Sequence, residues 1–180
     1  MNPKPLLYLC FLALTQCSKC KKDDPAPAEQ LPPATQTGAN TFGCLVNGQA
    51  WTSKTSSGYG AYLVQYEPGV NNPLGGNLNI RLTSDNNKMK VFLSAGPIFR
   101  VRSFALDSAA TEGTASYFDR DRAYPCNEVL NYDATYLTGN LTLTRLDEQA
   151  GVISGTFEFK LAKPGCDTIR VTQGRFDHRI

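Results

Sequence analysis

The chain has 180 residues, of which 41% are hydrophobic and 19% are charged, and these proportions are ordinary for a globular protein with one domain. Its formal net charge of +2 is too small to indicate a nucleic-acid-binding surface or a polybasic membrane patch, so we expect no nucleic-acid partner. The only histidine is His178, and no pair of closely spaced cysteines is followed by a second pair or by spaced histidines. This pattern argues against a zinc site, which needs about four such ligands.

The first seventeen residues, MNPKPLLYLCFLALTQC, have the pattern of an exported chain. Lys4 precedes an apolar run from Leu6 to Leu14 that is too short to span a bilayer, which takes about twenty residues. The following Leu14-Thr15-Gln16-Cys17 resembles a lipobox, which predicts a signal peptide over residues 1–16 and lipidation of Cys17. Gln16 departs from the small residue that is usual before the cysteine. A plain secretory signal or an uncleaved anchor is the alternative interpretation.

Residues 17–40 are predicted to be a lipidated N-terminus followed by a disordered tether. The segment is rich in proline and has almost no large apolar side chain, so it cannot bury enough surface to offset the entropy of ordering. Lys21-Lys22-Asp23-Asp24 resembles the charged signal that sends some lipoproteins to the outer membrane, although a solvated charge run is the alternative. We therefore expect the protein at the outer membrane, on its periplasmic face or at the cell surface, with the membrane as a partner through the acyl chains.

Residues 41–180 are predicted to form a single all-β domain. Asn47-Gly48 is a strong hairpin signal, and Gly174 interrupts the alternation of the last strand, which predicts a bulge there. No window has a long helical period bounded by caps. About eight to ten short, mostly antiparallel strands with regular turns indicate a β-sandwich or a flattened β-barrel. Apolar and polar residues alternate with the period of a strand in residues 77–83, 88–94, 139–146 and 152–161.

Three segments of this domain are characteristic: FGCLVNG at residues 42–48, ISGTFEF at 153–159 and GRFD at 174–177. Together with the N-terminal layout they resemble uncharacterised outer-envelope lipoproteins of the Bacteroidota type. The resemblance implies an all-β fold and an envelope address, and it places Gly155 and Gly174 at paired positions of the final hairpin. It carries no established activity and no catalytic residues.

Three cysteines lie in the predicted domain, and an oxidising envelope permits them to form one disulfide with one thiol left over. Cys44 alternates with Phe42 and Val46 and is expected to be buried. Cys126 and Cys166 follow turn residues, so of the three pairings we favour Cys126 with Cys166. Closing that loop contributes about 4 kcal/mol in the chain-entropy model.

Two groups of side chains are candidates for a functional site. The acidic group lies in one long loop, where calcium or a pair of hydrolytic carboxylates is one interpretation and a solvated loop is the other; it consists of Asp119, Asp121, Glu128 and Asp133. The aromatic group could stack on a glycan or dock a protein, and the alternative is that these side chains fill the core; it consists of Trp51, Tyr59, Tyr62, Tyr66, Tyr117, Phe118, Tyr124, Tyr132 and Tyr136.

The sequence contains no recognisable catalytic constellation, and we assign no catalytic, metal or cofactor residue. The hypothesis that follows is a non-enzymatic cell-envelope lipoprotein that presents its β domain for binding, with a glycan or a protein as ligand, or for a structural role. The alternative is a carbohydrate-active or other hydrolytic enzyme that uses the acidic loop residues.

Overall fold

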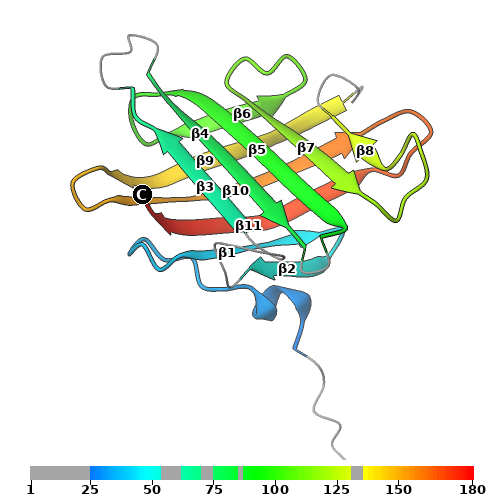
Figure 1. Cartoon of the computed structure of the whole chain (residues 1–180), viewed down its shortest axis with the longest axis horizontal. Coiled ribbons are helices and arrows are strands. Elements are labelled where there is room, and N and C mark those ends of the chain that lie inside the picture. Colours follow the sequence, from blue (N-terminus) through cyan, green and yellow to red (C-terminus); the bar gives the residue numbers. More distant parts are fainter. Residues whose placement is uncertain (1–24, 54–61, 70–74, 85–86, 131–135) are drawn as a thin grey trace, which may run out of the picture.

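The computed structural model describes residues 25–53, 62–69, 75–84, 87–130 and 136–180. Its strands form two antiparallel sheets, ordered β2-β1-β11-β10-β9-β6 and β3-β4-β5-β7-β8 (Figure 1). The predicted signal peptide, Cys17 and the charged run at 21–24 lie outside the described residues. The elements are η2 (Pro27–Gln30), β1 (Thr41–Val46), β2 (Gln49–Ser53), β3 (Tyr62–Glu67), β4 (Gly76–Thr83), β5 (Met89–Ile98), β6 (Ser103–Asp107), β7 (Gly113–Asp119), β8 (Glu128–Val129), β9 (Tyr136–Asp147), β10 (Val152–Ala162) and β11 (Ile169–Arg179).

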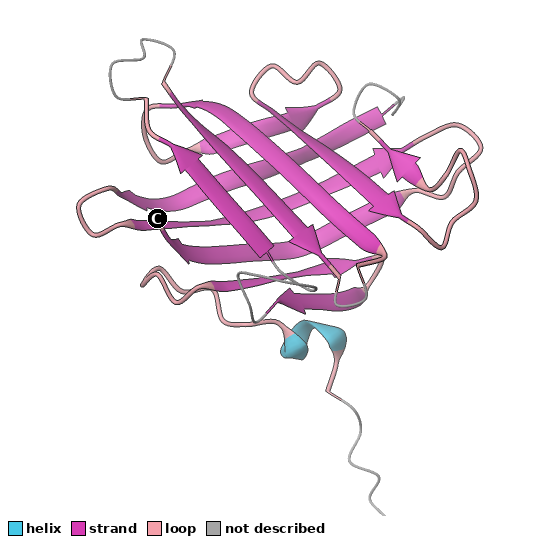
Figure 2. Ribbon diagram, in the orientation of Figure 1, coloured by secondary structure: helices cyan, strands magenta, loops and turns pink. Residues whose placement is uncertain are grey.

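The two sheets are stacked on one core, which confirms the all-β prediction and identifies the sandwich among the two architectures considered. Figure 2 shows the strands of one sheet crossing those of the other, with the short η2 turn beside them. The structure has more strands than the sequence predicts, partly because β8 is a two-residue strand inside the loop after β7. Among the described residues, none of the helical segments has the length and apolar character needed to cross a bilayer.

Alternation places one face of each strand in the core. On β4, Leu78, Ile80 and Leu82 are at most 2% exposed, while the residues between them face outward. The predicted hairpin at Asn47-Gly48 is also present: both residues have positive φ, 49° and 81°, and Val46 pairs with Gln49. Asparagine and glycine tolerate the left-handed conformation that a two-residue hairpin turn requires.

The last hairpin contains two reciprocal glycine–phenylalanine pairs. Gly155 of β10 lies opposite Phe176 of β11, and Phe157 of β10 lies opposite Gly174 of β11. Both strands carry the spacing Gly-x-Phe, so the antiparallel register brings each ring over the glycine of its partner strand. The resemblance correctly placed both glycines in this hairpin, but each pairs with a phenylalanine and not with the other glycine.

We expect Gly155→Ala to lower the free energy of unfolding by about 2 kcal/mol, because overpacking a filled core is destabilising. A Cβ atom at Gly155 would lie 2.5 Å from the Thr142 carbonyl oxygen and 2.8 Å from the Phe176 ring. Urea unfolding measures the change. Thr156→Ala, at the adjacent exposed position, is the control and should change stability by less than about 0.5 kcal/mol. Equal losses in the two variants would contradict the packing argument.

The bulge predicted at Gly174 is present one residue earlier in the chain. The pairing of β10 with β11 shifts between Phe157 and Phe159, and Gln173 has a φ of 53°. The extra residue on β11 directs Phe176 into the core, where it is 2% exposed. It also turns the Gln173 side chain outward over the sheet, where it is exposed.

The segment from residue 31 to residue 40, here called the strap, lies against the six-stranded sheet. Leu31 is 8% exposed, and Pro32 packs over Gly43 so closely that a Cβ atom there would lie 2.6 Å from Pro32 Cδ. The guanidinium of Arg145 donates a hydrogen bond to the Gln36 carbonyl. The ordered strap differs from the extended tether expected over residues 17–40. It packs on the sheet at Gly43, and its hydrogen-bond partners come from the far end of the chain.

The main partner of the strap is the carboxylate of Asp177, which is 1% exposed. It accepts hydrogen bonds from the backbone N–H groups of Thr37, Gly38 and Ala39 at 2.9, 2.8 and 3.1 Å. The hydroxyls of Thr35 and Ser154 donate two more at 2.6 and 2.7 Å. Burial alone raises the pKa of Asp177, but these hydrogen bonds outweigh it and hold that pKa well below its usual range.

A disulfide joins Cys126 to Cys166, which is the pairing favoured from the sequence, with Cα atoms 5.5 Å apart. Cys126 lies between β7 and β8 of the five-stranded sheet, and Cys166 lies between β10 and β11 of the six-stranded sheet. The bond therefore ties the two layers together at one end of the sandwich. Cys44 is buried and free, as expected.

Candidate functional site

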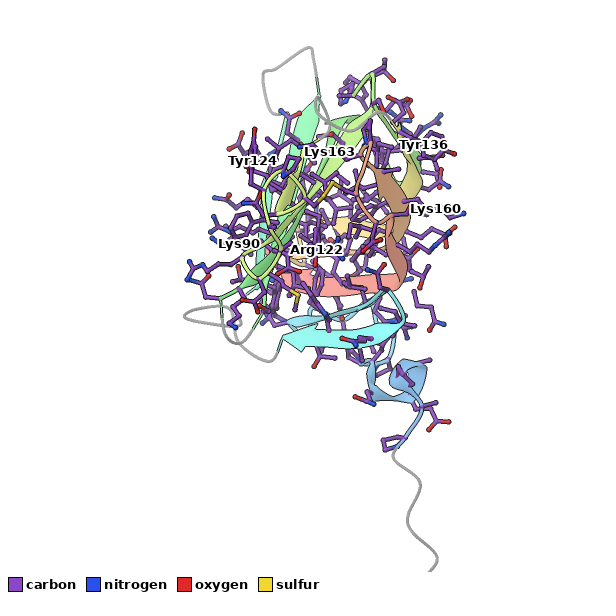
Figure 3. All side chains as sticks on the ribbon, turned by 90° about the vertical axis from the view of Figure 1, so that its right-hand side faces the viewer. Lys90, Arg122, Tyr124, Tyr136, Lys160 and Lys163 are labelled. Atoms are coloured by element: carbon purple, nitrogen blue, oxygen red, sulfur yellow. A yellow bond between two sulfur atoms is a disulfide. The ribbon has the colours of Figure 1, made fainter. Side chains whose placement is uncertain are left out.

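The described members of the aromatic group do not form a continuous row on the surface. Tyr62 and Tyr117 are buried in the core, and Trp51 and Tyr66 pack against it. Phe118 is half-buried on the outer face of β7. The exposed members are Tyr124 and Tyr136, at 89% and 54%, and Figure 3 shows them on opposite sides of the molecule. Tyr59 and Tyr132 lie outside the described residues.

The carboxylates of the acidic loop point to separate partners. Asp119 is 9% exposed and accepts hydrogen bonds from the Tyr117 hydroxyl at 3.2 Å and the Asp121 backbone N–H at 3.0 Å. The guanidinium of Arg122 lies 3.3 Å from the same carboxylate. Asp121 itself pairs with Lys88 at 2.8 Å.

Of the two other acidic candidates, Glu128 is exposed and Asp133 lies outside the described residues. In the part of the chain that the structure describes, no three histidine, cysteine or acidic side chains are grouped so as to hold a metal ion. The described acidic candidates therefore do not converge on one point where calcium or a scissile bond could sit.

The free thiol is buried in the core, and the half-buried histidine packs against a core residue. Burial raises the pKa of the Cys44 thiol to about 12, so this thiol stays protonated at neutral pH. Burial also lowers the pKa of His178, against the opposite effect of the Asp177 charge. The imidazole packs edge-on against Tyr62, with the hydroxyl 3.4 Å from Nδ1. The structure thus gives both groups a role in packing.

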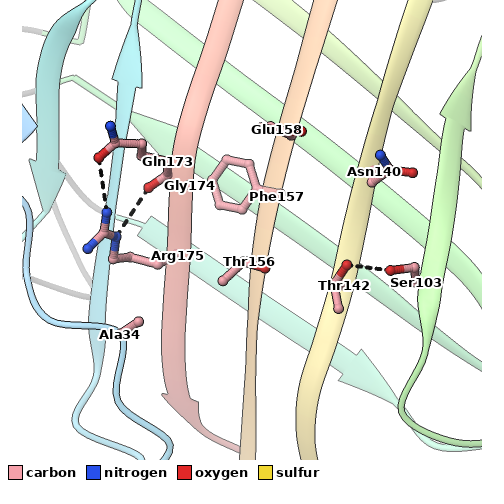
Figure 4. Close-up of a pocket in the computed structure, with 10 residues that line it drawn as sticks. All are labelled: Ala34, Ser103, Asn140, Thr142, Thr156, Phe157, Glu158, Gln173, Gly174 and Arg175. Atoms are coloured by element: carbon pink, nitrogen blue, oxygen red, sulfur yellow. Dashed lines mark hydrogen bonds between the residues drawn. The ribbon is translucent and has the colours of Figure 1, made fainter.

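A polar groove of about 580 Å³ crosses the outer face of the six-stranded sheet. Figure 4 shows its floor on β9, β10 and β11, with Ala34 of the strap on one side and Ser103 of β6 on the other. The lining side chains are mostly short and carry hydroxyl or amide groups. They are Ala34, Ser103, Asn140, Thr142, Thr156, Phe157, Glu158, Gln173, Gly174 and Arg175.

Strand register explains why the sheet is hollowed here. One row of outward positions crosses β6, β9, β10 and β11 as Ser103, Thr142, Thr156 and Arg175. The neighbouring row crosses β6, β9 and β10 as Ala105, Asn140 and Glu158. Serine, alanine and threonine leave a depression between the longer side chains of Glu158 and Arg175.

The strap forms the wall beside β11. Arg175 donates hydrogen bonds to the Pro32 carbonyl at 3.3 Å and to the Gln173 carbonyl at 3.2 Å. These bonds hold the guanidinium between strap and sheet. The wall therefore depends on the same strap that Asp177 anchors.

The groove continues along the sheet into a second hollow of about 320 Å³. Asn140 and Glu158 line both hollows, and Thr138, Lys160 and Thr172 extend the lining. Together the two hollows form a path of hydrogen-bond donors and acceptors over the sheet. Such a surface suits a ligand with many hydroxyl groups, which can exchange water for these side chains.

The groove offers hydrogen bonding but few groups for catalysis. Among its lining residues Glu158 is the only carboxylate, whereas glycoside hydrolysis uses a pair. These residues could not be identified as a site from the sequence, because they occupy the polar positions of ordinary alternating strands. The available signal was the run of small hydroxyl and amide residues at the polar positions of residues 138–142.

Comparisons of the chain with protein-family models, with curated proteins and with solved structures found no match.

Proposed function

We propose that this chain is a cell-envelope lipoprotein, lipidated at Cys17, whose sandwich binds a hydroxyl-rich ligand without transforming it. The observation that supports binding most directly is the polar groove on the six-stranded sheet. Its side chains can form many neutral hydrogen bonds, and its long, open shape fits an extended glycan. The engagement of Asp119 and Asp121 in contacts within the domain favours this proposal over the hydrolytic alternative.

The anchor and the strap together would hold the groove near the membrane. Fourteen peptide steps separate Cys17 from Leu31 at the start of the strap, a span of at most about 50 Å when fully extended. A domain on so short a connection samples ligands at the envelope surface. An outer-membrane location fits that role.

Cys17→Ala is expected to move the protein from the membrane fraction into the soluble fraction, because the variant has no thiol to which the lipid can be attached. Fractionation of cells measures the change, and mass spectrometry of the wild-type N-terminus identifies the lipid. Cys20→Ala, three residues away, is the matched control and should remain in the membrane fraction. An unmodified N-terminus in the wild-type protein would contradict the lipoprotein proposal.

Asn140→Trp is expected to abolish binding of neutral glycans, because the indole would fill the centre of the groove. Binding of the full chain, purified in detergent, to arrayed neutral polysaccharides measures the effect. Asn79→Trp places the same side chain on an outward position of the five-stranded sheet and should leave binding unchanged. Release of reducing sugars from a bound glycan would replace this proposal with the hydrolytic alternative.

A further inference from the structure

The outer face of the five-stranded sheet holds a hollow of different chemistry, with a volume of about 340 Å³. We call it the basic–aromatic hollow and define it by Arg81, Lys90, Phe92, Ser116, Phe118 and Glu128. Figure 3 shows Lys90 on the opposite side of the sandwich from Lys160, which lines the polar groove. The two sites are therefore separated by the whole thickness of the domain.

Strand register assembles these side chains on outward positions of β4, β5, β7 and β8. Arg81 pairs with Phe92, which pairs in turn with Ser116. In the next row Lys90 pairs with Phe118, which pairs with Glu128. Each phenylalanine of the hollow therefore has a cationic side chain at the paired position of a neighbouring strand.

Two features distinguish this face from an ordinary solvated sheet. Outward positions of an antiparallel sheet are usually polar, yet Phe92 and Phe118 occupy such positions in adjoining rows of the sheet and are only half-buried. The second feature is an excess of positive charge. The ion pairs among the described residues involve Lys88, Arg102, Arg122 and Arg145 and leave out both cations of the hollow.

The Lys90 side chain contacts an aromatic ring and not a carboxylate. Its ammonium lies 5.8 Å from the centroid of Phe118, which is within the range of a cation–π interaction. Arg81 is exposed, and its guanidinium can offer two parallel N–H groups to an anion. Glu128 is the only carboxylate in the lining, so the hollow keeps a net positive charge.

We propose that the basic–aromatic hollow binds an anionic sugar residue of a polysaccharide. The C–H face of a pyranose ring would lie on Phe92, and its carboxylate or sulfate would accept hydrogen bonds from Arg81 and Lys90. Ser116 and Glu128 would take the ring hydroxyls. One sugar of this kind uses the rings and the cations together, whereas an acidic peptide would use only the cations. The site is independent of the polar groove and of the function proposed for it.

The test measures binding of the detergent-purified full chain to four polymers: polygalacturonate for carboxylated glycans, chondroitin sulfate for sulfated glycans, dextran for neutral glycans and polyglutamate for acidic peptides. The wild type is expected to bind one or both anionic glycans in preference to dextran and polyglutamate. Arg81→Gln combined with Lys90→Gln should weaken that binding at least about tenfold, because it removes the charge-assisted hydrogen bonds. Phe92→Ser should weaken it about fivefold through loss of ring contact.

The control removes two charges elsewhere. Arg100→Gln combined with Arg170→Gln changes two exposed arginines outside both sites and should alter the dissociation constant less than twofold. Equal losses in the two double variants would show a non-specific charge effect and overturn the proposal. Polyglutamate binding as tight as glycan binding, or an unchanged affinity in Phe92→Ser, would overturn the assignment to a sugar. Asn140→Trp should not alter this binding, so failure of the groove proposal is measured separately.

Discussion

Replacing Asp177 with asparagine is expected to lower the free energy of unfolding by about 3 kcal/mol at neutral pH. Every partner of this buried carboxylate in the strap is a donor: the backbone N–H groups of Thr37, Gly38 and Ala39 and the hydroxyls of Thr35 and Thr37. An asparagine amide would place its NH₂ group against at least one of those donors. The strap would then lose its anchor.

Denaturant unfolding of the full chain, followed by the fluorescence of Trp51, measures this loss. Limited proteolysis should also cut the strap faster in Asp177→Asn. Asp167→Asn is the matched control, because Asp167 is exposed and should change stability by less than about 0.5 kcal/mol. A strap that stays protected in Asp177→Asn would contradict the anchoring role.

The same carboxylate predicts how stability changes with pH. The folded pKa of Asp177 lies below the ordinary value. At a pH between the folded and the unfolded pKa, the folded state therefore binds fewer protons than the unfolded state. Its contribution is therefore complete above the unfolded pKa of about 3.9 and is lost as the pH falls from there through the folded pKa. The stability difference between the wild type and Asp177→Asn should therefore shrink as the pH falls below about pH 4.

Removing the disulfide by replacing both Cys126 and Cys166 with serine is expected to cost about 4 kcal/mol of stability. The two cysteines are 40 residues apart, and opening a loop of that length restores conformational entropy to the unfolded chain. The bond also joins the two sheets, so its loss should free the loop between β7 and β8. Denaturant unfolding under oxidising conditions measures the effect.

Reduction provides the control for the disulfide prediction. A reducing agent should lower the stability of the wild type to about that of the double serine variant and should leave the variant unchanged. Cys44 is buried and free in the folded chain, so it contributes no disulfide to the folded state. A wild type that is equally stable in reducing and oxidising conditions would contradict the prediction.

The strap shows where composition alone is misleading. Residues 31–40 contain few large apolar side chains, so local sequence predicts disorder. Their partners are Asp177, more than 135 residues away, together with Gly43 and Arg145. Only the folded sheet brings these groups together, so no local pattern could reveal them.

Local physical rules were sufficient for several elements of the fold. Alternation determined the inward faces of β4, β9 and β10, Asn47-Gly48 determined a hairpin, and the break in alternation at Gly174 indicated a bulge. The pairing of Cys126 with Cys166 could be favoured because both cysteines follow turn residues. In each case the signal lies within a few residues of the feature, because strand period and turn geometry are local properties.

The tertiary structure decided which side chains share a surface. The sequence by itself determined an all-β chain with outward threonine, asparagine and glutamate on successive strands, and it left the acidic loop and the middle aromatics as the candidates for a site. The order and register of the strands then placed Asn140, Thr142 and Glu158 in one groove and Arg81 beside Phe92 in another, while Asp119 and Tyr117 turned inward. Strand order depends on contacts between distant segments, and these form only when the two sheets bury their common core.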